Sequence, residues 1–338
     1  MKIALFEKPH SLTIQSTPLR ALSPNEVLVK VLACGVCGTD VHIVEGTSRS
    51  TPPVVLGHEF NGVVESVGMA VHGIEPGQHV AVDPNISCGT CYYCRRGLVH
   101  LCANLQALGV DLNGGMAEYC FVPAQQIYRL PEGMQGDAAA FVEPVSCAIH
   151  GIDRASVRAG DTVVIVGGGT IGLIMLQLAR NAGASRTILV EPLEQKRRIA
   201  AELGADVILD PRANHIKTAV MDLTQVGADV VIECVGKPQT SQLSLELVRR
   251  GGTVEFFGVC PIGETISVEP NQIYFKELTV VGSYVNPNTF SRSISLLNAR
   301  KVRVDKFTID KFSLDDVHEA LAFQKEGKTI KSIIEPNR

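Results

Sequence analysis

The chain has 338 residues, a formal net charge of −4, 45% hydrophobic residues and 20% charged residues. These values are typical of a globular protein of about two domains and argue against a disordered or fibrous chain. The acidic balance gives no general attraction to nucleic acid, and we recognise no export signal and no membrane-spanning run. A cytoplasmic protein without nucleic-acid or membrane partners is therefore expected.

The first third of the chain contains short β-branched runs that glycine and proline interrupt. These runs, at 26–36, 61–68 and 77–82, predict a β-rich region with antiparallel or barrel-like strands.

From residue 161 the pattern changes to strands that alternate with glycine turns and amphipathic helices. The predicted strands lie at 162–166, 187–192, 229–234 and 253–259. This alternation predicts βαβ units and a doubly wound α/β domain with a parallel sheet. Two helical patterns follow at 288–302 and 313–327, and the last run, 331–336, is predicted to be a strand that returns to the first domain.

Four cysteines are clustered with the spacing Cys-x2-Cys-x2-Cys-x7-Cys, at Cys88, Cys91, Cys94 and Cys102. In a large chain without an export signal, this clustering favours metal binding over disulfides. Four thiolates complete the tetrahedral coordination of a structural zinc ion, so we expect this site to stabilise a lobe and not to react. An iron–sulfur cluster and separate free thiols are the alternatives.

A glycine motif, Gly167-x-Gly169-x-x-Gly172, follows a predicted strand and opens a predicted helix. Glycines here permit a tight turn and a close approach of the backbone to a pyrophosphate, and the helix N-terminus supplies positive partial charge. The motif predicts dinucleotide binding by this segment, with Thr170 and Ile171 included in the contact. A purely structural turn is the alternative.

Glu191 ends the next predicted strand, 19 residues after Gly172. A carboxylate there can accept hydrogen bonds from the adenosine ribose and would repel a 2′-phosphate, so NAD is expected in preference to NADP. Three basic residues follow, and one of these cations, with Lys196 as the candidate, could contact a cofactor phosphate. The simpler interpretation is that Lys196, Arg197 and Arg198 form the solvated face of a helix.

Cys37 and His58 offer a thiolate and an imidazole, which with one carboxylate would make a catalytic zinc site with an open fourth position. The carboxylate candidates are Glu59 and Glu143. Together with the Cys37 thiolate and a neutral His58, one carboxylate would neutralise the charge of Zn²⁺. Both carboxylates together would make the site anionic and fill its open position. We therefore expect three protein ligands, which are Cys37, His58 and one of the two glutamates. The other glutamate would hold a water molecule or exchange with the first as a ligand. A core thiol and a buried structural histidine are the alternatives.

Asp40 is expected to orient His58 through the second ring nitrogen of the imidazole. The alternative for Asp40 is a side chain that only stabilises a local turn.

The order of these motifs along the chain resembles the zinc-containing medium-chain alcohol dehydrogenase family over nearly the whole sequence. The residues that carry the resemblance are Cys37-Gly38-Thr39-Asp40-x-His42, Gly57-His58-Glu59, the four cysteines, Glu143-Pro144 and the Gly167–Gly172 motif. The segment Glu143-Pro144-Val145-Ser146 is similar to the sorbitol, or polyol, dehydrogenase branch.

The resemblance implies a fold and an assembly. It implies a β-rich GroES-like catalytic domain, residues 1–143 and 284–338, with a Rossmann NAD-binding domain, residues 144–283, inserted in it. It also implies one catalytic and one structural zinc ion per subunit. Homodimers or homotetramers are expected, joined through edge strands of the Rossmann domain within 253–259 and 277–283.

The resemblance further implies that zinc polarises a secondary alcohol while NAD accepts a hydride. It assigns the Thr39 hydroxyl as the first acceptor of the alcohol proton and His42 as the group that passes the proton towards solvent. A local turn hydrogen bond at Thr39 and an ordinary surface histidine at His42 are the alternatives.

The expected substrate is a polyol, a sugar alcohol or its phosphate. Sorbitol dehydrogenases usually have Tyr at the position of Ile43 and an Arg-Tyr pair at Val285-Asn286, so the match does not single out sorbitol. Arg49 could meet a substrate phosphate, although an ordinary exposed arginine is the simpler interpretation.

Three other functions compete with a polyol dehydrogenase. The segment 37–43 is also similar to L-threonine 3-dehydrogenases, and a simple aliphatic alcohol dehydrogenase comes third. A non-catalytic NAD- or zinc-binding protein is the alternative from another class, but such a protein would not need Thr39 and His42 as a proton relay.

Overall fold

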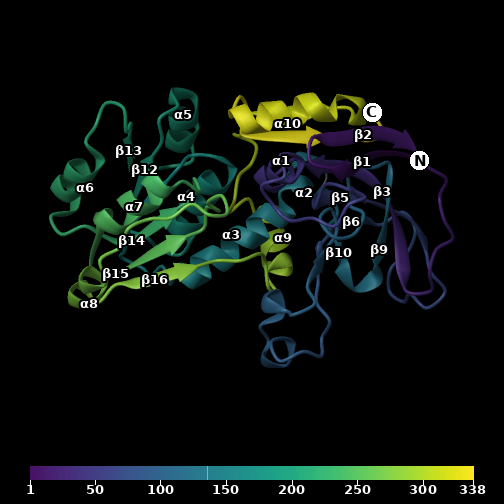
Figure 1. Ribbon diagram of the computed structural model, residues 1–338, viewed down its shortest axis with the longest axis horizontal. Helices are drawn as coiled ribbons and strands as arrows, with labels where there is room; N and C mark the ends of the chain where they lie inside the picture. The colour runs from purple at the N-terminus through teal and green to yellow at the C-terminus, as the bar shows by residue number, and fades with distance from the viewer. Residues whose placement is uncertain (135) are drawn as a thin grey trace. The chain divides into compact units, whose positions relative to one another are not determined.

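The computed structural model describes residues 1–134 and 136–338, and the chain forms two compact units (Figure 1). The first unit contains residues 1–146, 286–298 and 307–338, and the second unit contains residues 147–285 and 299–306. The sequence analysis assigns 299–306 to the catalytic domain, whereas these residues pack in the second unit. Their backbone is held there by Gln177, whose side chain exchanges two hydrogen bonds, of 2.7 and 3.2 Å, with the main chain of Arg303.

The first unit is built on a mainly antiparallel sheet with the strand order β10-β6-β5-β3-β18-β17, to which β9 adds by pairing with β3. A smaller sheet has the order β2-β1-β4, and β7 pairs with β8. The strands are β1 (Lys2–Lys8), β2 (Ser11–Ser16), β3 (Glu26–Gly35), β4 (Val54–Val55), β5 (Glu59–Val67), β6 (His79–Val82), β7 (Asn85–Ile86), β8 (Gln106–Ala107), β9 (Tyr119–Pro123), β10 (Ile127–Arg129), β17 (Ile309–Phe312) and β18 (Lys331–Ile334).

Short helices complete this unit. They are α1 (Gly38–Val44), η1 (Cys94–Arg96), η2 (Val99–Leu101), η3 (Ala124–Gln126), α2 (Asp137–Ala140), α9 (Phe290–Asn298), η4 (Leu314–Asp316) and α10 (Val317–Glu326), together with the first turn of α3 (Val142–Ala155). Figure 1 shows α10, in yellow near the C-terminus, beside α1.

Strand β3 is the centre of the first unit because it pairs with β5, β9 and β18. Its alternate residues Val27, Val29 and Val31 are completely buried, which is the environment that β-branched side chains favour in a sheet. The C-terminal strand β18 returns to pair with β3, with Ile333 opposite Gly35. The predicted return of the last strand to the first domain is confirmed.

The second unit is a doubly wound α/β domain with a six-stranded parallel sheet, in the order β13-β12-β11-β14-β15-β16. This is the strand order of a Rossmann fold, so the predicted fold class is confirmed. The strands are β11 (Thr162–Val166), β12 (Arg186–Val190), β13 (Val207–Leu209), β14 (Ala228–Glu233), β15 (Val248–Phe256) and β16 (Thr279–Gly282).

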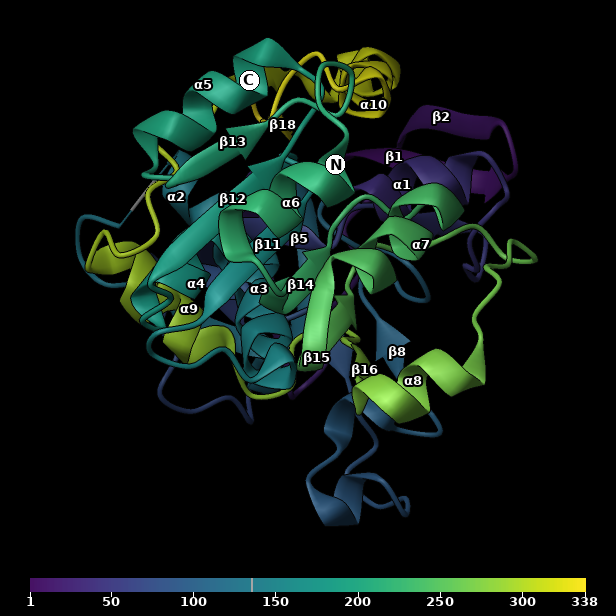
Figure 2. The same ribbon diagram turned by 90° about the vertical axis from the view of Figure 1, so that its left-hand side faces the viewer.

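Helices cover both faces of this sheet, as Figure 2 shows. Val164 and Val166 share a buried cluster with residues of α6 and α7, while Ile165 on the opposite face lies against α4. The helices are α4 (Thr170–Asn181), α5 (Glu194–Glu202), α6 (Ile216–Thr224), α7 (Pro238–Leu247) and α8 (Pro270–Lys276). Because both faces are covered, the central strand β11 is apolar at every position after Thr162.

The sheet edges differ from the expectation in one respect. Strand β15, which contains most of 253–259, lies between β14 and β16, so it is an internal strand and the expectation of an edge strand there is wrong. The open edge on that side is β16. Among the described residues, none of the helices is both long and apolar enough to cross a membrane.

Candidate metal and cofactor sites

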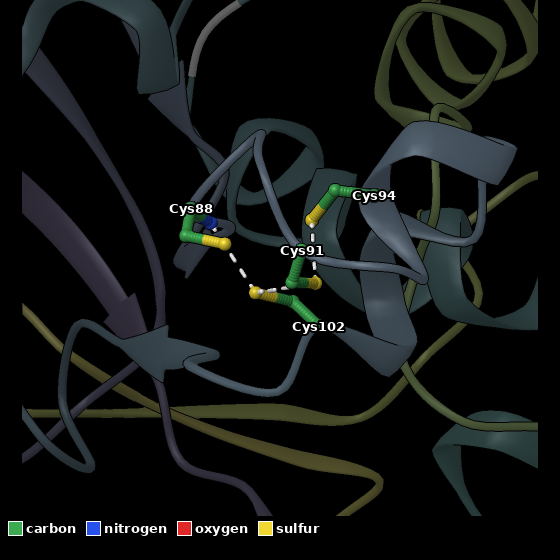
Figure 3. Close-up of side chains that lie close together, drawn as sticks. All are labelled: Cys88, Cys91, Cys94 and Cys102. Carbon is green, nitrogen blue, oxygen red and sulfur yellow. Dashed lines mark hydrogen bonds between the residues drawn. The ribbon is translucent and has the colours of Figure 1, made fainter.

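The four clustered cysteines come together at the tip of a lobe between β7 and β8 (Figure 3). The Sγ atom of Cys91 lies 3.5 Å from that of Cys94 and 3.9 Å from that of Cys102. Four sulfur atoms at about 2.3 Å from one zinc ion form a tetrahedron with edges of roughly 3.8 Å, so these distances fit a structural zinc site.

Backbone and hydroxyl donors surround these sulfur atoms. The N–H groups of Cys88 and Asn104 both lie 3.3 Å from Cys102 Sγ, and the Thr90 hydroxyl lies 3.6 Å from Cys88 Sγ. The backbone and hydroxyl of Thr90 lower the pKa of Cys88 to about 5. These donors stabilise thiolates, which are the form that binds zinc.

The second metal-binding group contains Cys37, His58 and Glu59, whose ligand atoms all lie within 4.8 Å of one another. Cys37 stands at the N-terminus of α1 just after β3, while Glu59 begins β5 and is preceded by His58. The pairing of β3 with β5 places Gly35 opposite Glu59, which brings the two segments together. A sulfur, a nitrogen and an oxygen ligand around one point fit zinc with an open position.

Asp40 occupies the predicted position beside His58. Its Oδ1 lies 3.4 Å from His58 Nδ1, and its Oδ2 accepts a 2.8 Å hydrogen bond from the backbone N–H of Cys37. Burial opposes the charged form of His58, but Asp40 and then Cys37 outweigh it and raise the pKa of the imidazole well above its ordinary value. The same negative field attracts a metal cation, and Nε2 is the ring nitrogen left to bind one.

Lys331 is a residue of this site that the sequence analysis missed. Its ammonium group contacts the carboxylate of Glu59, and both side chains are only 3% exposed. The signal in the sequence was one lysine within the predicted strand 331–336. The structure shows that all four residues of this strand, β18, are buried. Burial opposes the charge of Lys331, but Glu59 and then Cys37 outweigh it and raise the pKa of the ammonium group.

Glu143 lies in the first turn of α3 and is 8% exposed. It is not a member of the group formed by Cys37, His58 and Glu59, although its charge also acts on Lys331. Its role as a metal ligand stays a prediction, and the geometry favours Glu59 as the third ligand.

Thr39 and His42 lie three residues apart on α1 and therefore on the same side of this short helix. The Thr39 hydroxyl is 3.7 Å from Cys37 Sγ, next to the metal-binding group. Nδ1 of His42 is 3.2 Å from the Thr47 hydroxyl in an exposed contact. One hydroxyl beside the metal group and one imidazole near solvent are suitable parts of a proton relay.

The glycine motif has the backbone geometry of a nucleotide-binding turn. Gly167 has φ of 103°, a left-handed conformation that favours glycine. A side chain at Gly172 would collide with the carbonyl oxygen of Gly167. Gly169 is the N-cap of α4, with Thr170 and Ile171 in its first turn, so N–H groups of the helix are available to an anion.

Glu191 lies at the end of β12, beside this turn. Its two carboxylate oxygens accept 2.7 Å hydrogen bonds from the N–H groups of Gly168 and Leu193. Arg197 is engaged by Asp210 at 3.0 Å, and Arg198 is paired with Glu194. Of the three basic residues that the sequence analysis considered, Lys196 alone is without an ion pair among the described residues, and it is partly buried.

Three residues that the sequence analysis considered in relation to the substrate have other surroundings in the structure. Ile43 is completely buried in the core of the first unit. The Asn286 side chain is 2.6 Å from Asn85 and 3.3 Å from Asp83, whose pKa burial raises to about 6. Arg49 is exposed but pairs with Asp111 at 3.1 Å, so its charge is already compensated.

Comparison with known proteins covers nearly the whole chain. Residues 23–132 match the alcohol dehydrogenase GroES-like domain, and residues 170–299 match the zinc-binding dehydrogenase domain. An L-threonine 3-dehydrogenase of Pyrococcus horikoshii is 37% identical over 318 residues, which cover 92% of this chain and 91% of that protein. D-arabinitol dehydrogenase 1 of Uromyces fabae is 32% identical, with 100% of this chain and 97% of that protein covered.

Among solved structures, a chain from Sinorhizobium meliloti 1021 is described as a zinc-binding dehydrogenase and is bound to NADP. It is 41% identical, aligns with a TM-score of 0.96, and covers 99% of both chains.

Proposed function

Since the chain belongs to the zinc-containing medium-chain alcohol dehydrogenase family, we propose that it oxidises a secondary alcohol of a neutral polyol or sugar alcohol and reduces NAD. The observation that carries this proposal is the group of Cys37, His58 and Glu59, of which His58 and Glu59 are buried, with Thr39 on the adjoining helix. Zinc bound by these three side chains would supply a Lewis acid that polarises the alcohol.

The proton relay belongs to the chain itself. The Thr39 hydroxyl accepts the proton of the substrate hydroxyl at Oγ1 while it releases its own proton, and His42, one turn further along α1, takes up a proton and passes it towards solvent. The hydrogen bond between His42 Nδ1 and Thr47 holds the imidazole in place for this step. Burial of Glu59 and His58 keeps water away from the reacting groups.

NAD is proposed as the preferred cofactor because Glu191 presents a carboxylate at the end of β12, where a 2′-phosphate would meet like charge. The fold accommodates NADP in the Sinorhizobium meliloti relative, and Lys196 is the cation of this chain that could offset a 2′-phosphate. The ratio of kcat/KM for NAD and NADP measures the preference, and Glu191→Ala should shift it towards NADP.

The charge of the metal-binding pocket favours a neutral substrate. Asp40, Glu59 and Glu143 are buried acidic groups, and Lys331 is the buried lysine among the described residues of this region. With the Cys37 thiolate the negative groups number four, against three positive charges from Lys331 and a bound divalent ion. An additional anion would therefore be repelled, and Arg49 is already paired with Asp111. These charges support an unphosphorylated polyol over a sugar-alcohol phosphate.

L-threonine is the second candidate substrate. The Pyrococcus horikoshii relative, named as an L-threonine 3-dehydrogenase, is 37% identical over 92% of this chain. L-threonine also carries a secondary hydroxyl, so the same metal-binding group and proton relay would serve both reactions.

We propose that the chain forms a homo-oligomer through the edge strand β16. The side chains of Tyr274, Phe275 and Val280, on α8 and β16, are 76%, 70% and 40% exposed. Large exposed apolar side chains beside an open strand edge support pairing with a second copy of the chain. The ten free cysteines are typical of a reducing compartment, which supports the cytoplasm.

An activity screen tests the proposal. Formation of NADH is measured with a panel of polyols, polyol phosphates and L-threonine, with and without a chelator, and with NADP in place of NAD. We expect chelator-sensitive activity that is highest with a neutral polyol. If no alcohol yields NADH although metal and dinucleotide bind, the chain is a binding protein and not an enzyme.

Thr39→Ala tests the proton relay. Turnover should fall by about 10²–10⁴-fold because general base assistance is lost, while zinc content stays unchanged. Thr39→Ser retains the hydroxyl and is the matched control. Equal turnover in the Thr39→Ala protein and the wild type would remove Thr39 from the relay.

A further inference from the structure

Glu59 and Lys331 meet across a glycine. Their strands, β5 and β18, lie on the two sides of β3, where Gly35 pairs with Glu59 on one side and with Ile333 on the other. A side chain at Gly35 would collide with the Glu59 carboxylate and would stand 2.7 Å from Cε of Lys331. The missing side chain at Gly35 therefore provides the space in which a carboxylate and an ammonium group touch.

The pair is buried and charged. Both side chains are 3% exposed, so neither charge is screened by water. Breaking a buried ion pair leaves an uncompensated charge, which is strongly unfavourable. Two cations can therefore interact with the Glu59 carboxylate. One is the ammonium group of Lys331, and the other is a metal ion beside Cys37 and His58.

The contact uses one oxygen of the carboxylate. Lys331 Nζ touches Oε2 of Glu59, so Oε1 is the oxygen outside this contact and would be available to a metal ion. A carboxylate that bound zinc through both oxygens would fill the position that a catalytic site keeps open. Holding Oε2 thus has a direct effect on how many ligands the protein supplies.

We propose that Lys331 is a positioning residue that keeps Glu59 a one-oxygen metal ligand and so preserves the open position for the alcohol. This inference rests on the proposed zinc chemistry at Cys37, His58 and Glu59, but not on the identity of the substrate. Without Lys331, Glu59 turns both oxygens to the metal, binds it more tightly and closes the site.

The test uses the full-length protein loaded with Co²⁺, without alcohol or dinucleotide. Release of the metal to a chelator and the visible absorption band of Co²⁺ are measured for the wild type and for Lys331→Met. Lys311→Met is the matched control, because Lys311 is a half-exposed lysine on the neighbouring strand β17 that pairs with Asp137 and Glu335. The Cys37→Ala protein identifies which release phase belongs to this site and which to the cysteine lobe.

In Lys331→Met we expect about tenfold slower release. This is the size of effect that outer partners of metal ligands usually have, but in the opposite direction, because the second oxygen of Glu59 would be freed to bind the metal. The absorption band should shift, because that oxygen would take the place of water at the fourth position. The control should behave as the wild type. Wild-type release together with a wild-type band in Lys331→Met, or faster release, overturns the proposal. A change of the same size in a Glu59→Gln background also overturns it, because Lys331 would then not act through Glu59.

Lys331→Arg keeps the test decisive if Lys331→Met does not fold. A guanidinium group binds both oxygens of a carboxylate and would draw Glu59 away from the metal, so release should become faster. Release at or below the wild-type rate overturns the proposal. Because no alcohol is present in any arm, the outcome is independent of whether the chain oxidises polyols.

Discussion

The cysteine lobe and the group of Cys37, His58 and Glu59 are two metal-binding clusters built in different ways. The lobe takes all its ligands from one loop, Cys88 to Cys102, and its sulfur atoms receive hydrogen bonds from nearby N–H and hydroxyl groups. The other group takes its ligands from the ends of two strands, and buried charges at Asp40 and Lys331 surround it.

The difference teaches how a closed and an open site are encoded. A closed site needs only ligands at suitable spacing on a short loop, because the metal itself organises them. An open site must hold three protein ligands in place and must also prevent a further protein group from binding the metal. Strand register and buried counter-charges provide that restraint in this chain.

The largest effect is expected from Cys37→Ala. Loss of the thiolate should remove the catalytic metal and reduce turnover by more than the 10–100-fold typical of outer partners. Zinc analysis should give one ion fewer per chain, while thermal unfolding changes little because the lobe is intact. If the Cys37→Ala protein lost no metal, the two clusters could not be distinguished as separate metal sites.

Cys94→Ser should also remove one zinc ion, but its effect should be on the lobe. The thiolates would no longer be neutralised, and the loop should open around η1, which carries Arg95 and Arg96. Trypsin cleavage there should accelerate at least about tenfold, equivalent to about 1.4 kcal/mol of local stability. Cys120→Ser, at a buried cysteine outside the lobe, is the control, and equal cleavage in both variants would contradict the prediction.

Asp40→Asn should weaken metal binding without abolishing it. The amide cannot supply the negative charge that faces His58 Nδ1 at 3.4 Å, so metal affinity should fall by about 10–100-fold. Competition with a fluorescent chelator measures the change. Unchanged affinity would mean that Asp40 only caps α1.

The last comparison concerns a buried carboxylate that, unlike Glu59, forms no ion pair among the described residues. Glu255 on β15 is completely buried, neither of its oxygens has a hydrogen-bond partner in the described chain, and Arg154 is the charge that acts on it. Burial raises the pKa of Glu255 to about 8 from 4.5.

Because the folded form keeps its proton between these two values, the free energy of unfolding should decrease by about 1.4 kcal/mol per pH unit as pH rises from about 5 to 8. Glu255→Gln should remove this contribution, so its gain in thermal stability over the wild type should be larger at pH 8 than at pH 5. The same difference at both pH values would show that Glu255 has an ordinary pKa.

The two clusters also show which features of the fold and of the sites could be predicted from the sequence. The lobe could be predicted from spacing, and the doubly wound α/β domain from the alternation of apolar runs and glycine turns, because both signals are local. Asp40 was found from its place near Cys37. These predictions needed no information on distant contacts.

Lys331 and the preference for Glu59 over Glu143 could not be derived in the same way. They depend on the pairing of β18 and β5 with β3. Gly35 on β3 and Ile333 on β18 are 298 residues apart (333 − 35), and register over such a separation leaves no periodic signal. The assignment of β15 to an edge failed for a related reason, since β16 follows a loop and a short helix that hide its pairing.

The pairing of β18 with β3 has a consequence for the order in which the molecule matures on the ribosome. All four cysteines of the lobe have been synthesised by residue 102, whereas Lys331, on β18, follows 229 residues later (331 − 102). The lobe can capture its ion during translation. The centre at Cys37, His58 and Glu59 acquires its buried cation only once β18 has been synthesised, so a product that stops before β18 would lack the residue proposed to keep the metal site open.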